Sequence, residues 1–227
     1  MRIAMKILFE NQIKSQIYMM TDNFIDLKAG DIHKAVGADN RMPSCCNAMR
    51  NFMKGDDKIL SQPPQGDGSS VTIRYFRKNH PFKKIGLIAC SKSKTGENDH
   101  TEIFLAQNIY TGNVFKESKK YCLEPSNGFD DWYILSDMHH LLDKNALISY
   151  YDMDLNKLGA TYCQLWSQIV FKQLESKFDL KNDIFYIFGA RNYYKHLLGH
   201  LNCVVFEYKG RNCMNLQTPR IYLNGGK

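Results

Sequence analysis

Three short apolar segments, each running directly into a polar loop, limit most strongly what this chain can fold into. They are residues 85–89 in KKIGLIACSKSK, 132–135 in DWYILSD and 184–188 in DIFYIFGARN. Helical stretches separate them, and CVVFEY at 203–208 predicts a fourth strand. Strands that alternate with helices predict a mainly parallel sheet with helices on both faces. We therefore expect residues 81–227 to form an α/β domain.

Polar side chains follow each of these predicted strands. Parallel strands end at one edge of a sheet, and ligands of α/β sheets bind beyond that edge. Each side chain alone also fits an ordinary role, such as a buried thiol, a helix cap or a surface cation. Three polar strand ends together favour a binding site. The residues expected there are Cys90, Ser91, Lys92, Lys94, Ser136, Asp137, His139, His140, Arg191 and Tyr193.

The first 80 residues predict a smaller module, with 12 lysines and arginines against 8 aspartates and glutamates. Residues 22–36 predict two short helices interrupted at Gly30, and residues 43–54 predict a further helix with an apolar and a polar face. Turn residues and the alternating VTIRYFR then predict a hairpin. This order is typical of a winged helix-turn-helix at residues 20–80, preceded by a possible extension at residues 1–19. An ordinary solvated helix and hairpin is the alternative.

In a winged helix-turn-helix the second helix enters the major groove, where asparagine and arginine read base edges. The net charge of +7 fits a polyanionic partner. We therefore expect double-stranded DNA as the partner and no membrane association. The predicted DNA contacts are Arg41, Asn47, Arg50, Lys54, Arg74, Arg77 and Lys78.

The composition indicates a globular cytoplasmic protein. Apolar residues make up 44% of the chain, which is enough for a core, but no run of about 18 apolar residues or signal peptide is evident. The seven cysteines are odd in number and form no C-x-x-C motif. We expect free thiols, no structural metal and no cofactor.

Five motifs of the second domain resemble, in order and spacing, those of a bacterial and phage domain family. They are GLIACSKSK, IYTGNVFKESKKY, DWYILSDMHHLL, YYDMDL and FGARNYYKHLL, within about residues 85–201. This family is similar to the accessory domain of archaeosine tRNA-guanine transglycosylases, to uracil-DNA glycosylases and to anti-phage DNA glycosylases that remove modified cytosine. The resemblance implies a uracil-DNA-glycosylase-like fold and base excision. Asp137 and His140 stand where the family usually has alanine and glycine.

Base excision breaks a C1′–N bond through an oxocarbenium-like state that a nearby carboxylate stabilises. Asp152 is the first candidate for this role and Asp137 the second. His139, His140, Lys92 or Arg191 would donate to the departing base. A flipped base also needs aromatic faces, for which Tyr110, Tyr150, Tyr151 and Tyr193 are candidates. In the alternative interpretation of YYDMDL, Asp152 or Asp154 only caps the following helix.

These observations predict a DNA glycosylase that flips out and excises a modified base from phage DNA as an antiviral defence. Glucosylated hydroxymethylcytosine is the expected base. Two alternatives stay open: a DNA-binding regulator whose α/β domain senses a nucleotide, and a nucleoside hydrolase or base-exchange enzyme. The preferred base, the oligomeric state and strand cleavage after excision are left open by the sequence.

Overall fold

In a computed structural model the chain divides into two compact units, with the boundary between Pro81 and Phe82. We call the part up to Pro81 unit 1 and the part from Phe82 onward unit 2. The structure describes residues 2–207 and 219–223, with side chains from residue 5 onward. The last residue of the strand expected at 203–208 lies outside this range.

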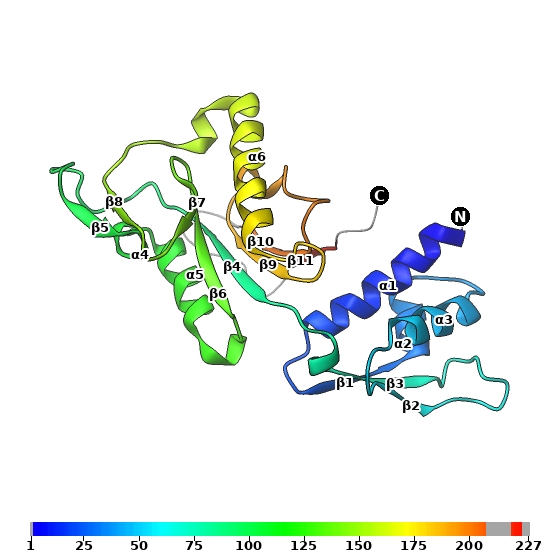
Figure 1. The fold of residues 1–227 in the computed structure, drawn as a ribbon. Helices are drawn as coiled ribbons and strands as arrows, with labels where there is room; N and C mark the ends of the chain where they lie inside the picture. Colours follow the sequence, from blue (N-terminus) through cyan, green and yellow to red (C-terminus); the bar gives the residue numbers. More distant parts are fainter. Residues whose placement is uncertain (1, 208–218, 224–227) are drawn as a thin grey trace. The chain divides into compact units, whose positions relative to one another are not determined.

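Unit 1 is a three-stranded antiparallel sheet with three helices on one side (Figure 1). Its strands lie in the order β1-β3-β2. The first half of the unit contains α1 (Arg2–Tyr18), β1 (Phe24–Lys28) and α2 (Ala29–Ala35). The second half contains α3 (Met42–Phe52), β2 (Lys58–Ser61), β3 (Thr72–Phe76) and the 3-10 turn η1 (Arg77–Asn79).

Two expectations for unit 1 are corrected. Residues 1–19 are not a loose extension, because α1 buries Phe9, Ile13 and Ile17 in the core of the unit. The region 22–36 also begins as a strand, because residues 24–28 pair with β3 and bury Leu27 between them and the helices. The i, i+3 spacing of Phe24 and Leu27 suggested one face of a helix, but in the strand the two side chains lie on opposite faces, with Phe24 exposed and Leu27 buried.

A buried carboxylate fastens the end of unit 1. The Asp57 side chain is fully buried and accepts hydrogen bonds from the backbone N–H groups of Lys54 (2.9 Å) and Phe76 (2.8 Å). It also contacts Asn79 Nδ2 at 2.8 Å and His80 Nε2 at 2.6 Å. His80 directly precedes Pro81, so this network fixes the chain where unit 1 ends.

Unit 2 is built on a six-stranded sheet in the order β11-β10-β9-β4-β6-β7. The four central strands are parallel and the edge strands β7 and β11 are antiparallel, which confirms the predicted α/β class. The strands are β4 (Lys84–Ala89), β6 (Asp131–Ser136), β7 (His140–Asp143), β9 (Ile184–Phe188), β10 (Cys203–Phe206) and β11 (Arg220–Tyr222). A separate ribbon pairs β5 (Ile103–Leu105) with β8 (Leu147–Ser149).

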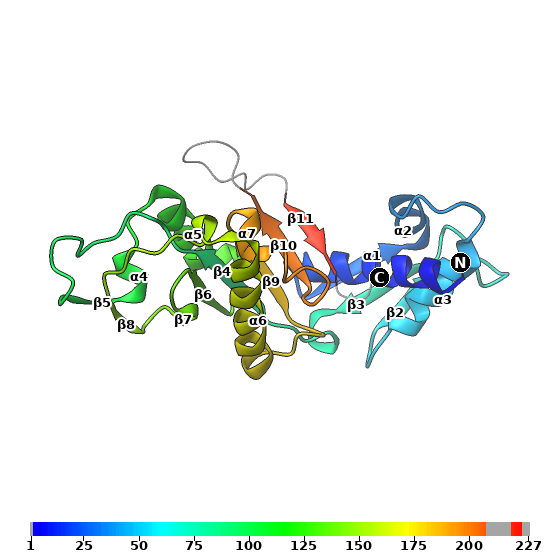
Figure 2. The ribbon, with the colours of Figure 1, turned by 90° about the horizontal axis from the view of Figure 1, so that it is seen from above.

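Helices cover both faces of this sheet (Figure 2). On one face, Cys122 of α5 (Asn113–Leu123) packs so closely on Gly86 that an added Cβ there would lie 2.5 Å from its sulfur. On the other face lies α6 (Gly159–Lys177), and Phe178 directly after it packs on Tyr133 and Phe185. The remaining short elements are α4 (Ala106–Ile109), η2 (Pro125–Asn127), η3 (Leu155–Lys157) and α7 (Arg191–Tyr194).

The strand order locates the ligand edge of the sheet. From β4 the chain moves to β6 on one side and afterwards to β9 on the other, so the order reverses between β4 and β9. Open α/β sheets bind ligands beyond the carboxyl ends of the strands at such a switch point. The residues directly after Ala89 and Phe188 therefore frame the first place to look for a site.

The described cysteines agree with the expectation of free thiols. Six cysteines are described, and all are buried and unbridged. Among the described residues, no helix combines the length and apolar character needed to cross a bilayer.

Candidate functional site

A pocket of about 250 Å³ opens at the switch point of unit 2. It is formed by the loops that follow β4, β6 and β9 together with the start of α5 and the segment before α6. Three polar strand ends thus contribute to one cavity. The lining residues are Cys90, Ser91, Lys92, Gly112, Asn113, Val114, Phe115, Asp137, Met153, Asp154, Asn156, Ala190 and Tyr193.

Asp137 is the most deeply buried carboxylate of this pocket, at 4% exposure. The Tyr193 hydroxyl donates a hydrogen bond to its Oδ1 at 2.6 Å and lies 3.7 Å from the Cys90 sulfur. Burial raises the pKa of Asp137 above its usual range, although the Tyr193 and Cys90 hydrogen bonds oppose this rise. A carboxyl group with a raised pKa can carry a proton to a leaving group near neutral pH.

Cys90 does not have the properties of a nucleophile. Burial raises the pKa of its thiol to about 12, and the neighbouring Asp137 carboxylate adds to this rise. Since the thiolate is the reactive form, Cys90 is inert near neutral pH. Its role here is to pack beside Asp137 and Tyr193.

The amino end of α5 forms the electropositive wall of the pocket. Gly112 caps this helix, and its N–H donates to Ser91 Oγ at 3.2 Å. An added Cβ on Gly112 would lie 2.7 Å from the Ser91 Cβ, so the helix start approaches the loop after β4 closely. The first turn of α5, which is fully described, contains no acidic residue to offset the positive end of the helix dipole. Lys92 adds a cation to the same side of the pocket.

A second carboxylate reaches the pocket from the segment before α6. Asp154 caps the turn η3, and its Oδ1 accepts a hydrogen bond from Asn156 N at 3.0 Å. Asp154 thus caps the short turn that precedes α6, whereas α6 itself begins after Leu158 without a side-chain cap. The negative charge of Asp154 also contributes to the raised pKa of Asp137.

Asp152, the first candidate for catalysis, is exposed and does not line the pocket. The two residues that follow it, Met153 and Asp154, do line the pocket. Tyr150 also lies outside the lining and stacks on His100, with ring centroids 4.8 Å apart. Arg191 begins α7 as an exposed residue that does not line the pocket.

Four further predicted pocket residues form a buried network instead of a stacking surface. The Tyr151 hydroxyl lies 2.9 Å from both the Tyr110 hydroxyl and Ser136 Oγ. The Lys94 ammonium lies 4.3 Å from the centre of the Tyr151 ring and is itself 8% exposed. None of these four residues lines the described pocket, so they support its walls without reaching a ligand inside it.

His139 and His140 belong to a tight hairpin turn between β6 and β7, which pairs Ser136 with His140. Both histidines are half-buried, neither lines the pocket, and burial lowers their pKa values. His140 has a φ of 61°, in the left-handed region that favours glycine. Glycine would adopt this backbone conformation without the strain that a side chain brings.

Replacing His140 with glycine is expected to give a protein about 1 kcal/mol more stable than the His140→Ala variant. Both variants lose the imidazole, but alanine keeps the left-handed strain. Urea unfolding followed by tryptophan fluorescence measures the difference, because Trp132 and Trp166, the only tryptophans, lie in unit 2. Equal stability of the two variants would show that the strain is negligible.

Several lining residues were missed at the sequence level. Gly112, Asn113 and Val114 lie at the start of a helix and not after a strand. The rule that ligands bind beyond the carboxyl ends of the strands therefore did not select them. The motif IYTGNVF, which contains them, was the available signal. Ala190 was not among the candidate residues, because it has no polar side chain.

In unit 1 several predicted DNA contacts are engaged within the fold. Arg50 donates to Asp67 at 2.6 Å and to the Gly66 carbonyl at 2.5 Å, which holds the β2–β3 loop against α3. Arg74 makes two hydrogen bonds to Asp26, each of 2.7 Å. Arg77 contacts the Met20 carbonyl at 3.5 Å, Lys78 pairs with Asp56 at 2.6 Å, and the Lys54 side chain is exposed.

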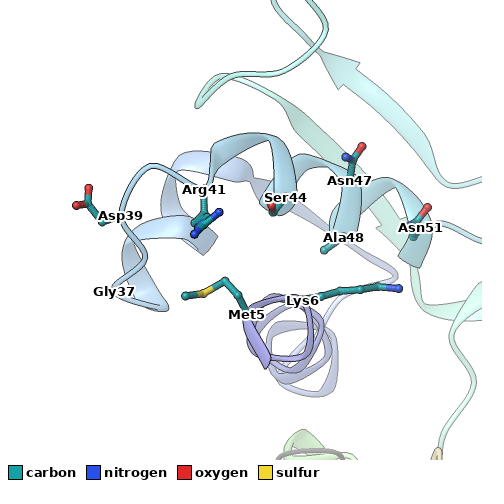
Figure 3. Close-up of a pocket in the computed structure, with 9 residues that line it drawn as sticks. All are labelled: Met5, Lys6, Gly37, Asp39, Arg41, Ser44, Asn47, Ala48 and Asn51. Atoms are coloured by element: carbon teal, nitrogen blue, oxygen red, sulfur yellow. The ribbon is translucent and has the colours of Figure 1, made fainter. Parts of the chain in front are cut away.

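Arg41 and Asn47 border a pocket of about 640 Å³ between α1 and α3 (Figure 3). Along α3 the exposed Ser44, Asn47 and Asn51 follow one another at helical spacing. Lys6 reaches the same pocket from α1, which lies in the segment expected to be a possible extension. This surface presents amides, a hydroxyl and cations in one place.

Comparisons with known proteins identify the family of unit 2. No curated protein and no solved structure matches the chain. A family of unknown function, DUF6884, matches residues 85–211, which is more than half of the 227 residues. The matched region contains the strands β4, β6, β9 and β10 and every residue that lines the unit 2 pocket. The chain therefore belongs to the DUF6884 family.

Proposed function

We propose that unit 2 hydrolyses the N-glycosidic bond of a nucleotide in DNA, and that unit 1 brings it to the duplex. The buried Asp137 carboxyl in the switch-point pocket is the observation that carries this proposal. At about 250 Å³ the pocket is smaller than most drug-binding cavities and suits a group the size of one nucleoside. The parallel strand order and the helices on both faces support a uracil-DNA-glycosylase-like fold.

In the proposed reaction the C1′–N bond breaks and its electron pair leaves with the base. The oxygen of a water molecule then bonds to C1′. One proton of that water ends on the departing base, which leaves an abasic sugar and a free base. Positive charge therefore develops on the sugar and negative charge on the base.

The two pocket carboxyl groups and the α5 end match these two charges. Asp137, with its raised pKa, donates a proton to the departing base and regains one from the attacking water, so that the net transfer is one water proton to the base. Asp154 is more exposed and supplies the carboxylate that stabilises the sugar cation or orients the water. The N–H groups at the start of α5 and the Lys92 ammonium stabilise negative charge on the base or on a flanking phosphate.

The order α1-β1-α2-α3-β2-β3 in unit 1 supports a winged helix-turn-helix in which α3 contacts DNA. The exposed Ser44, Asn47 and Asn51 on α3 would face base edges. Arg41 and Lys6 flank them as phosphate contacts. Arg50 has a different role here, since it fixes the β2–β3 loop beside α3.

The test is to incubate the full chain with plain, hydroxymethylated and glucosylated phage DNA and to measure alkali-labile abasic sites and released base. We expect abasic sites in the modified DNA as part of an antiviral defence. Cleavage of free nucleosides instead of DNA would support the nucleoside hydrolase. Footprinting at a defined site with no release of base would support the nucleotide-sensing regulator.

A further inference from the structure

The unit 1 sheet has an outer face turned away from the three helices (Figure 1). Aromatic and cationic side chains on this face take no part in the proposed base excision. On the inner face Leu27, Ile73 and Tyr75 are buried. Because side chains alternate along a strand, the residues between them point outward. This outer sheet face comprises Phe24, Asp26, Lys28, Lys58, Thr72, Arg74 and Phe76.

Two phenylalanines lie at one end of this outer sheet face. Phe24 and Phe76 are paired across β1 and β3, with ring centroids 6.2 Å apart, and Phe24 is 40% exposed. The Arg74 guanidinium carbon lies 3.8 Å from the centre of the Phe24 ring. Asp26 holds that guanidinium through two hydrogen bonds of 2.7 Å. The Arg74 guanidinium, held by Asp26, thus lies over the Phe24 ring at the surface of the protein.

Lysines lie near these phenylalanine rings. Lys58 Nζ lies 6.0 Å and Lys78 Nζ 5.7 Å from the centre of the Phe76 ring. Lys78 also pairs with Asp56, but both side chains are more than half exposed, at 68% and 56%. Such an exposed ion pair contributes little to stability, so a phosphate can replace the carboxylate. Lys28, also exposed, extends the cationic character along β1.

We propose that the outer sheet face binds single-stranded nucleic acid. An unpaired base stacks on the assembly of Phe24 and Arg74, and the backbone phosphates lie near Lys58 and Lys78. Proteins that hold single strands combine aromatic stacking surfaces with a cationic path for the backbone. The outer sheet face is separate from the α3 surface proposed to contact duplex DNA. Binding of a single strand to it requires no chemistry at Asp137. It therefore extends the proposed function by giving the protein a contact with an unpaired strand.

The test uses the full chain and a fluorescently labelled oligo-dT of about 15 nucleotides, with fluorescence anisotropy at low salt. Phe24→Ala is expected to weaken binding about 5-fold or more, since each stacked base contributes about 1–3 kcal/mol. Ile59→Ala is the matched control, because Ile59 is 39% exposed in the same sheet and pairs with Ile73 of the inner face. Its affinity is expected to equal that of the wild type. Phe24→Trp is expected to retain binding.

Salt dependence tests the phosphate contacts separately. Lys58→Ala is expected to reduce the slope of log affinity against log salt by about 0.7. The inference is overturned if the wild type does not bind the oligonucleotide, if Phe24→Ala binds as well as the wild type, or if Ile59→Ala loses as much affinity. Equal weakening of single-strand and duplex binding by Phe24→Ala would overturn the single-strand assignment. Asp137→Asn is expected to bind the oligonucleotide normally, so failure of base excision and failure of this inference are distinguishable.

Discussion

Replacing Asp137 with asparagine is expected to lower the rate of base release by about 100-fold or more, the usual contribution of a positioned proton donor. Asparagine keeps the size of the side chain and can still accept the Tyr193 hydrogen bond, but it has no carboxyl proton to give. The measurement is the single-turnover rate at which abasic sites form in modified DNA. The rate of base release by the variant no longer depends on a carboxyl group at position 137. The titration of that group should therefore also disappear from the pH profile of the rate.

Asp152→Asn is the matched control for this prediction. It makes the same chemical change at a carboxylate that is exposed and outside the pocket lining. Its rate should remain within about 2-fold of the wild type, the scale of surface substitutions away from such a site. If Asp152→Asn loses the activity and Asp137→Asn keeps it, the first choice from the sequence is right and the assignment from the pocket is wrong.

The Asp137→Asn variant should also be at least as stable as the wild type near neutral pH. Burial raises the pKa of Asp137, so the folded state holds its proton to higher pH than the unfolded chain does. The contribution of Asp137 to stability is therefore greatest at low pH and is lost as the pH rises through the folded-state pKa. A neutral asparagine removes that loss. Urea unfolding followed by tryptophan fluorescence checks this and shows that lost activity does not arise from unfolding.

The parallel core of unit 2 could be predicted because its signal is local. A strand such as IFYIF, buried on both faces, is apolar without interruption, and the polar loop after it marks its end. Six of the pocket residues were accordingly found, namely Cys90, Ser91, Lys92, Asp137 and Tyr193 as candidates and Asp154 as a cap. The choice within YYDMDL was less certain, because Asp152 is exposed whereas Asp154, two residues later, lines the pocket.

Unit 1 shows a second limit of sequence reasoning. The role of α1 could not be predicted, because its buried residues Phe9, Ile13 and Ile17 acquire a partner only when α2 and α3 pack against them. Charge alone also did not reveal the partners of Arg50 and Arg74 within the fold. Both were expected at DNA, but the aspartates that engage them are 17 and 48 residues away in sequence. Such pairs form through the fold and leave no local pattern.

Replacing Asp57 with alanine is expected to destabilise unit 1 by about 3–5 kcal/mol, the cost of removing one partner from a buried charged network. The substitution leaves Phe76 N, Lys54 N and the His80 ring without their acceptor inside the protein. Circular dichroism during urea unfolding measures the loss. The tryptophan signal, which reports only unit 2, should change much less if the two units unfold separately.

The pH dependence of this effect has a defined sign. Burial acts to raise the pKa of Asp57, but hydrogen bonds from Phe76, Asn79, Lys54 and His80 together outweigh it and hold the pKa below its usual range. The carboxylate therefore contributes stability that is fully present above the unfolded-state pKa of about 3.9 and is lost as the pH falls through the folded-state pKa. Asp57→Asn, which keeps the shape and one acceptor oxygen, should differ most from the wild type near pH 7 and least in acid. A difference that grows as the pH falls would contradict the network described for Asp57.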